Sequence, residues 1–212
     1  MPTRPKPAIV ITPETTRMVL EFEVISRAYY ERQLTGLICP GGASGPTGGI
    51  GYDFGHQSPG MIRFTWGWHP QIEALVRLSG AVGDGPCRTA VARAKEVRIS
   101  WADGVRVFEQ DTLPRYARLA RHAYGTGYDL LMPNGQGSLT SNTQNRGSSM
   151  TGARARHKRA IRDNCLPTTD HSCLAAQLAA QCVLWEGTPI YAGLCRRRKA
   201  ESQLAITWEG TQ

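Results

Sequence analysis

One stretch rich in glycine limits most strongly what this chain can fold into. Residues 39–60 read CPGGASGPTGGIGYDFGHQSPG, in which glycine or proline recurs every few positions. Glycine weakens a helix interior and proline interrupts it, so a helix is not expected here. Both residues favour tight turns, and the stretch is therefore predicted to form turns with short strands.

Helical patterns lie on both sides of this stretch. Before it, apolar residues at helical spacing predict a helix that is capped by Thr15 or Thr16 and runs to Tyr29. After it, helical spacing recurs within residues 71–82, 87–97, 113–125 and 172–187. A small irregular β region followed by a mainly helical body predicts an α+β protein with segregated lobes.

The domain organisation follows from length and composition. With 212 residues, 41% of them apolar, the chain can bury one core, which can be split into two lobes. We expect an extended, proline-punctuated arm at residues 1–14, one domain at 15–206 and a short tail at 207–212. By composition alone, residues 133–152 are typical of a flexible linker.

The charge of the chain favours an anionic partner. A formal net charge of +8 attracts polyanions, and nucleic acid, anionic lipid and bacterial cell wall all fit that description. Neither an apolar run of signal-peptide length at the start nor about 18 consecutive apolar residues anywhere is visible. We therefore expect synthesis in the cytoplasm without a signal peptide, and no membrane span.

The six cysteines form no CxxC pair, which disfavours a zinc ribbon or a thioredoxin-like motif. Their even number fits disulfides, with free buried thiols as an equal alternative. Cys165 and Cys173, eight residues apart across a turn that contains Pro167, are the pair predicted to form a disulfide.

Two acidic residues are candidates for glycosidic bond hydrolysis, which needs a proton donor and a second group, usually a carboxylate. Asp53 lies among glycines, where backbone without side chains can approach a ligand closely. Glu23 lies between Phe22 and Val24, apolar neighbours that favour the protonated carboxyl of a general acid. On residue chemistry alone, a solvated glutamate and a turn aspartate are the commoner interpretation.

The run Thr47-Gly48-Gly49-Ile50-Gly51 resembles the T-x-G-I-G run of glycoside hydrolase family 24, the bacteriophage lysozymes. Asp53 follows Thr47 by six residues, as in the pesticin-like branch of that family. The resemblance implies that Glu23 is the general acid, that Thr47 and Asp53 position and activate the water, and that Gly49 and Tyr52 bind substrate. Glu23 is preferred over Glu21 because it follows an aromatic residue and precedes the ISRAYY run, as in similar lysozymes.

The resemblance extends from about residue 16 to residue 205. Asn145-Arg146-Gly147 is similar to an N-R-G segment of the family, and Trp185 with GLCRRRKAE at 193–201 is similar to its closing pattern. The resemblance implies that Asn145 and Arg146 bind substrate. It also implies a core helix at about 134–145, despite the Gly, Ser and Asn content of that stretch.

These features together predict a lysozyme-like α+β fold, with a small β-hairpin lobe and a larger helical lobe. The implied activity is that of a muramidase, which acts as a monomer on the peptidoglycan glycan strand in the periplasm or a target cell envelope, without cofactor, metal or nucleic acid. A phage endolysin, a bacteriocin and an injected effector all fit, and a toxin would require an immunity protein. The alternative is a degenerate lysozyme fold that only binds cell wall or another polyanion.

Two basic runs and two tryptophans complete the candidates. One predicted basic surface comprises Arg154, Arg156, Lys158, Arg159 and Arg162, and a second comprises Arg196, Arg197, Arg198 and Lys199. Each is either an ordinary solvated helix face or a surface that draws the protein to anionic wall polymers. Trp66 and Trp68 are candidates for lining a sugar cleft.

Overall fold

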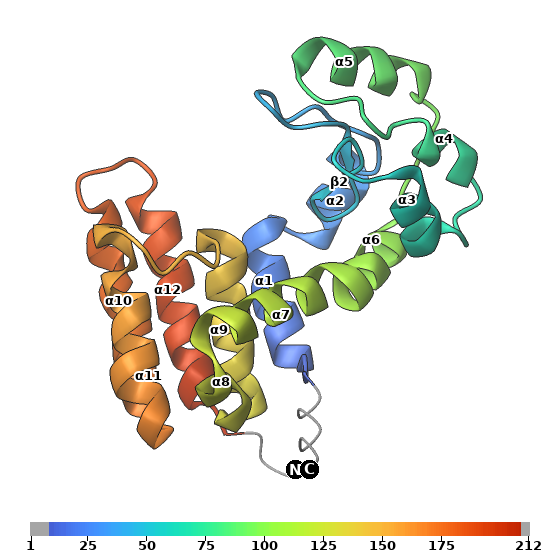
Figure 1. The fold of residues 1–212 in the computed structure, drawn as a ribbon. Coiled ribbons are helices and arrows are strands. Elements are labelled where there is room, and N and C mark those ends of the chain that lie inside the picture. The colour runs from blue at the N-terminus through green and yellow to red at the C-terminus, as the bar shows by residue number, and fades with distance from the viewer. Residues whose placement is uncertain (1–8, 209–212) are drawn as a thin grey trace. The chain divides into compact units, whose positions relative to one another are not determined.

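The computed structural model describes residues 9–208, which are mostly helical and include one small antiparallel sheet (Figure 1). This composition agrees with the predicted α+β class. The chain divides into two compact units: unit 1 comprises residues 1–22 and 113–212, and unit 2 comprises residues 23–112. Most of the expected arm at 1–14 and of the expected tail at 207–212 lies outside the described residues.

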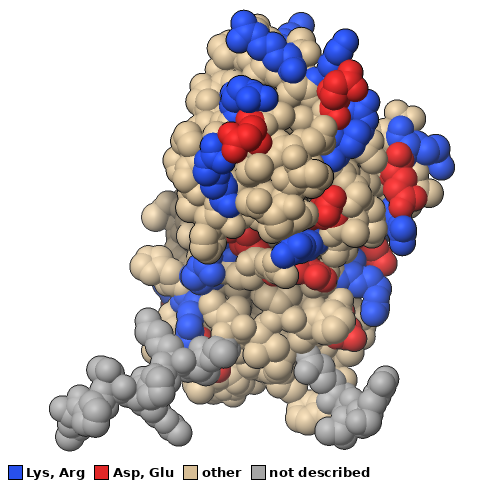
Figure 2. Space-filling view, turned by 90° about the vertical axis from the view of Figure 1, so that its right-hand side faces the viewer, with Lys and Arg blue, Asp and Glu red and all other residues tan. Residues whose placement is uncertain are grey.

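The surface carries charges of both signs. On the face shown in Figure 2, Lys and Arg side chains are interspersed with Asp and Glu instead of gathering in one basic patch. Arg63 with Glu73 and Arg27 with Glu31 form exposed ion pairs. Within the part of the chain that the structure describes, none of the helices combines the length and apolar character needed to cross a bilayer.

Unit 2 holds the glycine-rich segment, which forms turns and two short strands as predicted. Its elements are α2 (Arg27–Gln33), β1 (Thr47–Gly48), β2 (Tyr52–Asp53), α3 (Pro59–Trp66), α4 (Ile72–Val76), α5 (Asp84–Arg93), α6 (Trp101–Val107) and a π-helical turn (Phe108–Thr112). The strands pack on an aromatic core, in which the rings of Tyr52, Phe54 and Trp66 lie 4.8–5.5 Å apart between centroids. Trp66 is fully buried, so its prediction as a cleft-lining residue is wrong.

The first predicted helix is shorter than expected and has a different cap. α1 (Pro13–Glu23) begins after Thr12, whose Oγ1 accepts a hydrogen bond from the backbone N–H of Thr15. The helix ends at Glu23 and does not run to Tyr29, because Ser26 starts a new helix. The Ser26 hydroxyl accepts from the N–H of Tyr29 and thereby caps α2.

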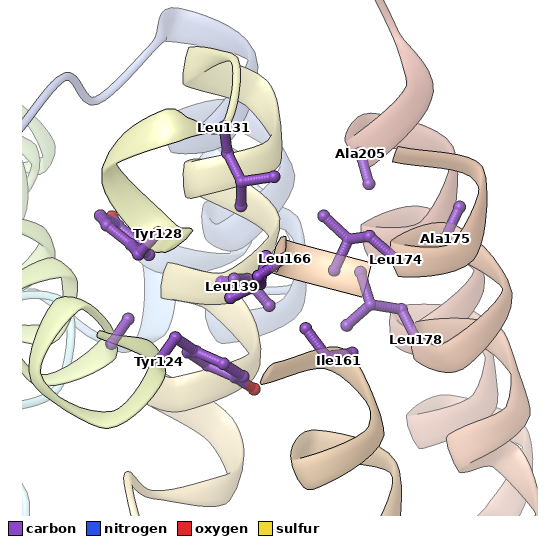
Figure 3. Close-up of a cluster of buried hydrophobic side chains, with 11 residues drawn as sticks. Tyr124, Tyr128, Leu131, Leu139, Ile161, Leu166, Leu174, Ala175, Leu178 and Ala205 are labelled. Carbon is purple, nitrogen blue, oxygen red and sulfur yellow. The ribbon is translucent and has the colours of Figure 1, made fainter. Parts of the chain in front are cut away.

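Unit 1 is helical throughout its described elements. These are α1 up to Phe22, α7 (Leu113–Tyr124), α8 (Thr126–Leu130), α9 (Pro133–Arg146), a 3-10 turn (Ala153–Ala155), α10 (Arg156–Ala160), a π-helical turn (Ile161–Cys165), a 3-10 turn (Leu166–Thr168), α11 (His171–Ala180), a 3-10 turn (Gln181–Trp185) and α12 (Tyr191–Ile206). Leu139 of α9, Leu174 and Leu178 of α11 and Tyr128 of α8 converge in its apolar core (Figure 3).

All six cysteines form disulfides, so the alternative of free thiols is wrong. Cys165 pairs with Cys173, as predicted, and Cys182 pairs with Cys195 in the same unit. Cys39 pairs with Cys87 and ties the glycine-rich segment to α5 of unit 2. Each unit is thus cross-linked within itself.

Helix α9 confirms the helix predicted at 134–145 and shows that the linker interpretation of residues 133–146 was wrong. Ten consecutive residues, Asn134–Thr143, are buried, although most of them are polar or glycine. α7 and α12 pack against this helix, and α1 approaches it so closely that a Cβ on Gly137 would overlap the side chain of Thr15. A helix with this composition stays buried only if its polar groups find hydrogen-bond partners.

The main partner is Glu201 of α12, a fully buried carboxylate. It accepts hydrogen bonds from Ser141 Oγ at 2.7 Å, Asn142 Nδ2 at 2.9 Å and Arg198 Nη2 at 2.7 Å, with Arg197 Nε at 3.4 Å. Arg197 and Arg198 are therefore buried, so the predicted second basic surface is wrong for these two residues. Their positions four and three residues before Glu201 place them on its side of α12.

Candidate functional site

The candidate site is built on the β1–β2 hairpin of unit 2. Thr47 pairs with Asp53 and Gly48 with Tyr52, so three residues connect the strands. Two of the three, Gly49 and Gly51, have φ values of 59° and 73°, which only glycine adopts without strain. Because Thr47 and Asp53 are directly opposite each other in the ladder, their side chains project from the same face of the hairpin.

Gly45 connects these two side chains through its backbone. Its N–H donates to Asp53 Oδ2 at 3.1 Å, and its carbonyl accepts from Thr47 Oγ1 at 3.1 Å. A Cβ at this position would lie 2.5 Å from the Cα of Gly55 and 2.8 Å from Asp53 Oδ1. The absence of a side chain at Gly45 is therefore required for the contact that orients both candidate groups.

His56, which the sequence interpretation did not place in the site, also contacts Asp53. Its backbone N–H donates to Asp53 Oδ1 at 3.2 Å, while its ring Nε2 bonds the carbonyl of Ala43 at 2.8 Å and lies 3.8 Å from Asp53 Oδ2. A carbonyl only accepts, so Nε2 carries the proton. Asp53 is partly buried, and each of its oxygens accepts one backbone bond, which leaves further lone pairs for a water.

Glu23 is the last residue of α1 and shares a pocket with the hairpin. The pocket has a volume of 160 Å³, and its lining includes Glu23, Val24, Thr47, Gly48, Gly49 and Ile50. Gly48 has no room for a side chain, because a Cβ would lie 2.8 Å from side-chain atoms of both Ile99 and Leu37. Glu23 is exposed, so the apolar enclosure expected from its neighbours is not what the structure shows.

The four predicted substrate-binding residues do not all lie in this pocket. Gly49 lines the pocket that contains Glu23 and Thr47. Tyr52 is 7% exposed and packs in the core of unit 2, so it supports the hairpin and does not present its ring to a ligand. Asn145 and Arg146 belong to unit 1, at the end of α9.

Asn145 and Arg146 line a separate pocket of 360 Å³ within unit 1. Its lining also includes Ser149, Arg154, Lys158 and Trp185. Of the first predicted basic surface, Lys158 is buried in this pocket, whereas Arg154 and Arg156 are exposed.

The described residues contain no group of three or more His, Cys, Asp or Glu side chains that could hold a metal ion. Comparison with known proteins finds neither a family model nor a curated protein that matches the chain.

Proposed function

We propose that the chain is a peptidoglycan hydrolase with a lysozyme-like fold, a muramidase that cleaves the β-1,4 bond between N-acetylmuramic acid and N-acetylglucosamine. One observation carries the proposal: Glu23 and Thr47 line the same pocket, and Asp53 is directly opposite Thr47 in the hairpin ladder. A carboxyl group, a hydroxyl group and a second carboxyl group thus come from two short segments, and a pair of carboxyl groups is what most glycoside hydrolases use.

In this proposal, Glu23 protonates the leaving oxygen, and Thr47 with Asp53 holds the attacking water. The hydroxyl of Thr47 donates to Gly45, so its lone pairs remain able to accept from the water. Asp53 is oriented by two backbone N–H groups and can accept the water's other proton. The Glu23 and Asp53 carboxyls are expected to be about 6.5–9.5 Å apart for inversion, or about 5 Å apart for retention.

Release of dye from labelled peptidoglycan tests the activity. Glu23→Gln is expected to abolish release while it preserves the fold, because it removes the acid and keeps the shape. Glu21→Gln is the matched control, since Glu21 is an exposed carboxylate on the same helix that does not line this pocket, and it should retain nearly full activity. If Glu21→Gln is the inactive variant, the assignment of the acid is wrong.

The same assay separates hydrolysis from binding alone. Asp53 accepts two backbone hydrogen bonds, so it also stabilises the hairpin, as it would in a non-catalytic wall-binding protein. If the wild-type protein sediments with purified cell walls but releases no dye, the hydrolase proposal fails and the binding alternative replaces it. A chitin substrate in parallel tests for another sugar preference.

We propose the bacterial envelope as the place of action, whether as an endolysin, a bacteriocin or an injected effector. Only a toxin acting on its producer's relatives requires an immunity protein. Expression in the periplasm of a bacterium that lacks such a protein should lyse the cells, and Glu23→Gln should prevent lysis.

A further inference from the structure

The pocket of unit 1 concentrates positive charge around one tryptophan ring. The guanidinium carbons of Arg146, Arg154 and Arg198 lie 5.6, 5.7 and 5.8 Å from the ring centroid of Trp185. Lys158 lines the same pocket with a side chain that is 1% exposed. Arg146, Arg154 and Lys158 therefore line this pocket together with Trp185, and Arg198 approaches the same ring without lining the pocket.

The positive charge is only partly compensated. Within the described residues, Glu201 pairs with Arg198, whereas neither Arg146 nor Arg154 forms an ion pair. Arg198 is fully buried against Trp185 and does not line the pocket, so it adds positive charge near the site without contacting a ligand there.

Lys158 and Arg146, which line the pocket, are held in place by uncharged oxygen acceptors and not by carboxylates. Lys158 Nζ donates to the carbonyls of Gly147 and Ser149 at 2.7 Å each, and Arg146 Nη2 donates to the carbonyl of Arg154 at 2.6 Å. Burial, followed by the charge of Arg146, lowers the pKa of Lys158 to about 8. Burial, followed by the charge of Arg198, lowers the pKa of Arg146 to about 10. Both shifts arise first from burial, with repulsion from a neighbouring arginine as the second cause.

We infer that this pocket is a binding site for an oxyanion, a carboxylate or phosphate group that is attached to a larger polar body. Arginine side chains match the planar, two-oxygen geometry of such groups. Ser149 and Asn145 line the pocket and supply further polar contacts. The volume of 360 Å³ is many times the roughly 30 Å³ that one water molecule occupies in the liquid, so the site has room for a sugar or short peptide that carries the anion.

The inference does not depend on the proposed hydrolysis, because binding is measured without turnover. Inorganic sulfate is the first probe, titrated at constant ionic strength against chloride, with the indole N–H signal of Trp185 followed by nuclear magnetic resonance. Trp185→Phe identifies that signal. A saturable shift with sulfate that chloride does not produce is the expected result.

Arg154→Gln tests the pocket itself, because Arg154 is exposed and the bond to Arg146 uses only its backbone carbonyl. Sulfate affinity should fall tenfold or more, which corresponds to about 1.4 kcal/mol. Arg156→Gln is the matched control: it removes the same charge from an exposed residue that does not line the pocket, and affinity should stay within twofold. Arg154→Lys should give an intermediate affinity.

Two outcomes would overturn the inference: a wild-type signal that does not respond to sulfate, or equal weakening in the Arg154→Gln and Arg156→Gln variants. Glycerol phosphate and soluble, carboxylate-bearing muropeptides then distinguish the sources of the anion. Saturation by either one supports the inference and identifies the source, and saturation by neither contradicts it.

Discussion

The hairpin segment (residues 39–57) and the α9 segment (residues 133–152) both carry several glycines among small and polar residues, but they fold in opposite ways. The hairpin segment forms turns around two short strands, whereas most of the α9 segment is a buried helix. Four glycines of the hairpin segment have positive φ values, and those within α9 do not. Glycine thus allows tight backbone turns in the hairpin segment and close packing between helices in the α9 segment.

The two segments also differ in where their polar groups find partners. Asp53 is bonded by Gly45 and His56, eight and three residues away. Asn134 instead donates to the carbonyl of Thr207, 73 residues away, and Asn142 donates to Glu201, 59 residues away. Contacts between residues close in sequence therefore determine the conformation of the hairpin segment, and tertiary packing determines the conformation of the α9 segment.

The largest expected change in stability tests whether the α9 segment depends on distant hydrogen-bond partners. Glu201→Gln removes the acidic partner of buried Arg198, and it should destabilise the protein by about 3–5 kcal/mol in urea unfolding. Asp53→Asn should cost only about 1–2 kcal/mol, because a carboxamide oxygen can still accept from a backbone N–H. Glu73→Gln, in an exposed ion pair with Arg63, should leave the unfolding midpoint nearly unchanged. If Glu201→Gln behaves like Glu73→Gln, the buried network does not hold α9.

The Cys39–Cys87 disulfide is a distant covalent constraint on the hairpin segment. Cys39–Cys87 closes a loop with a sequence separation of 48, and Cys165–Cys173 closes one of only 8. In the chain-entropy model, loss of the first should cost about 4 kcal/mol and loss of the second about 2.5 kcal/mol. Thermal unfolding of the two double Cys→Ser variants measures the difference. Equal losses would show that loop length does not govern the contribution.

The third prediction concerns the loop that ends the α9 segment, where Lys158 binds two carbonyls. The pKa of Lys158 is lowered to about 8 in the folded protein, below its ordinary value near 10.5 in the unfolded chain. Between these values the unfolded chain binds more protons, so this residue's contribution to stability rises with pH. From pH 8 to pH 9.5, the free energy of unfolding of the wild type should rise by about 1–2 kcal/mol relative to that of Lys158→Met. Urea unfolding of both proteins measures this difference. A constant difference across this range would contradict the assignment.

The comparison also explains what the sequence could predict. The turns, the short strands and the Cys165–Cys173 pair follow from local chemistry, and the helix at 134–145 was expected only from the family resemblance. The burial of Arg197 and Arg198 and the core position of Trp66 depend on packing, whereas the break after Glu23 has a local signal in the capping residue Ser26. A signal for the buried charges was present, since Glu201 follows the two arginines at helical spacing.

For the candidate site, the sequence indicated which residue types occur on the hairpin but not how they are held. The contact of His56 with Asp53 follows from their spacing of three residues, which is typical of an aspartate that accepts from a turn N–H. The role of Gly45 could not be predicted, because it depends on the close approach of Gly55.

The smallest expected change in stability comes from replacing helical glycines. Comparing two of them separates the effect of close packing from that of helix propensity. Alanine stabilises an exposed helix interior relative to glycine by about 0.5–1 kcal/mol. Gly193→Ala in α12 should show this gain, because nothing lies within 4 Å of the added Cβ. Gly137→Ala in α9 should instead cost about 1–3 kcal/mol, since the added Cβ overlaps Thr15 of α1. Urea unfolding of both variants measures the sign of each change. In a Gly137→Ala, Thr15→Gly double variant, a loss smaller than the sum of the two single losses would identify the overlap as the cause. If Gly137→Ala stabilises the protein as Gly193→Ala does, then propensity and not close packing governs the α9 segment, and the contrast with the hairpin segment fails at this position.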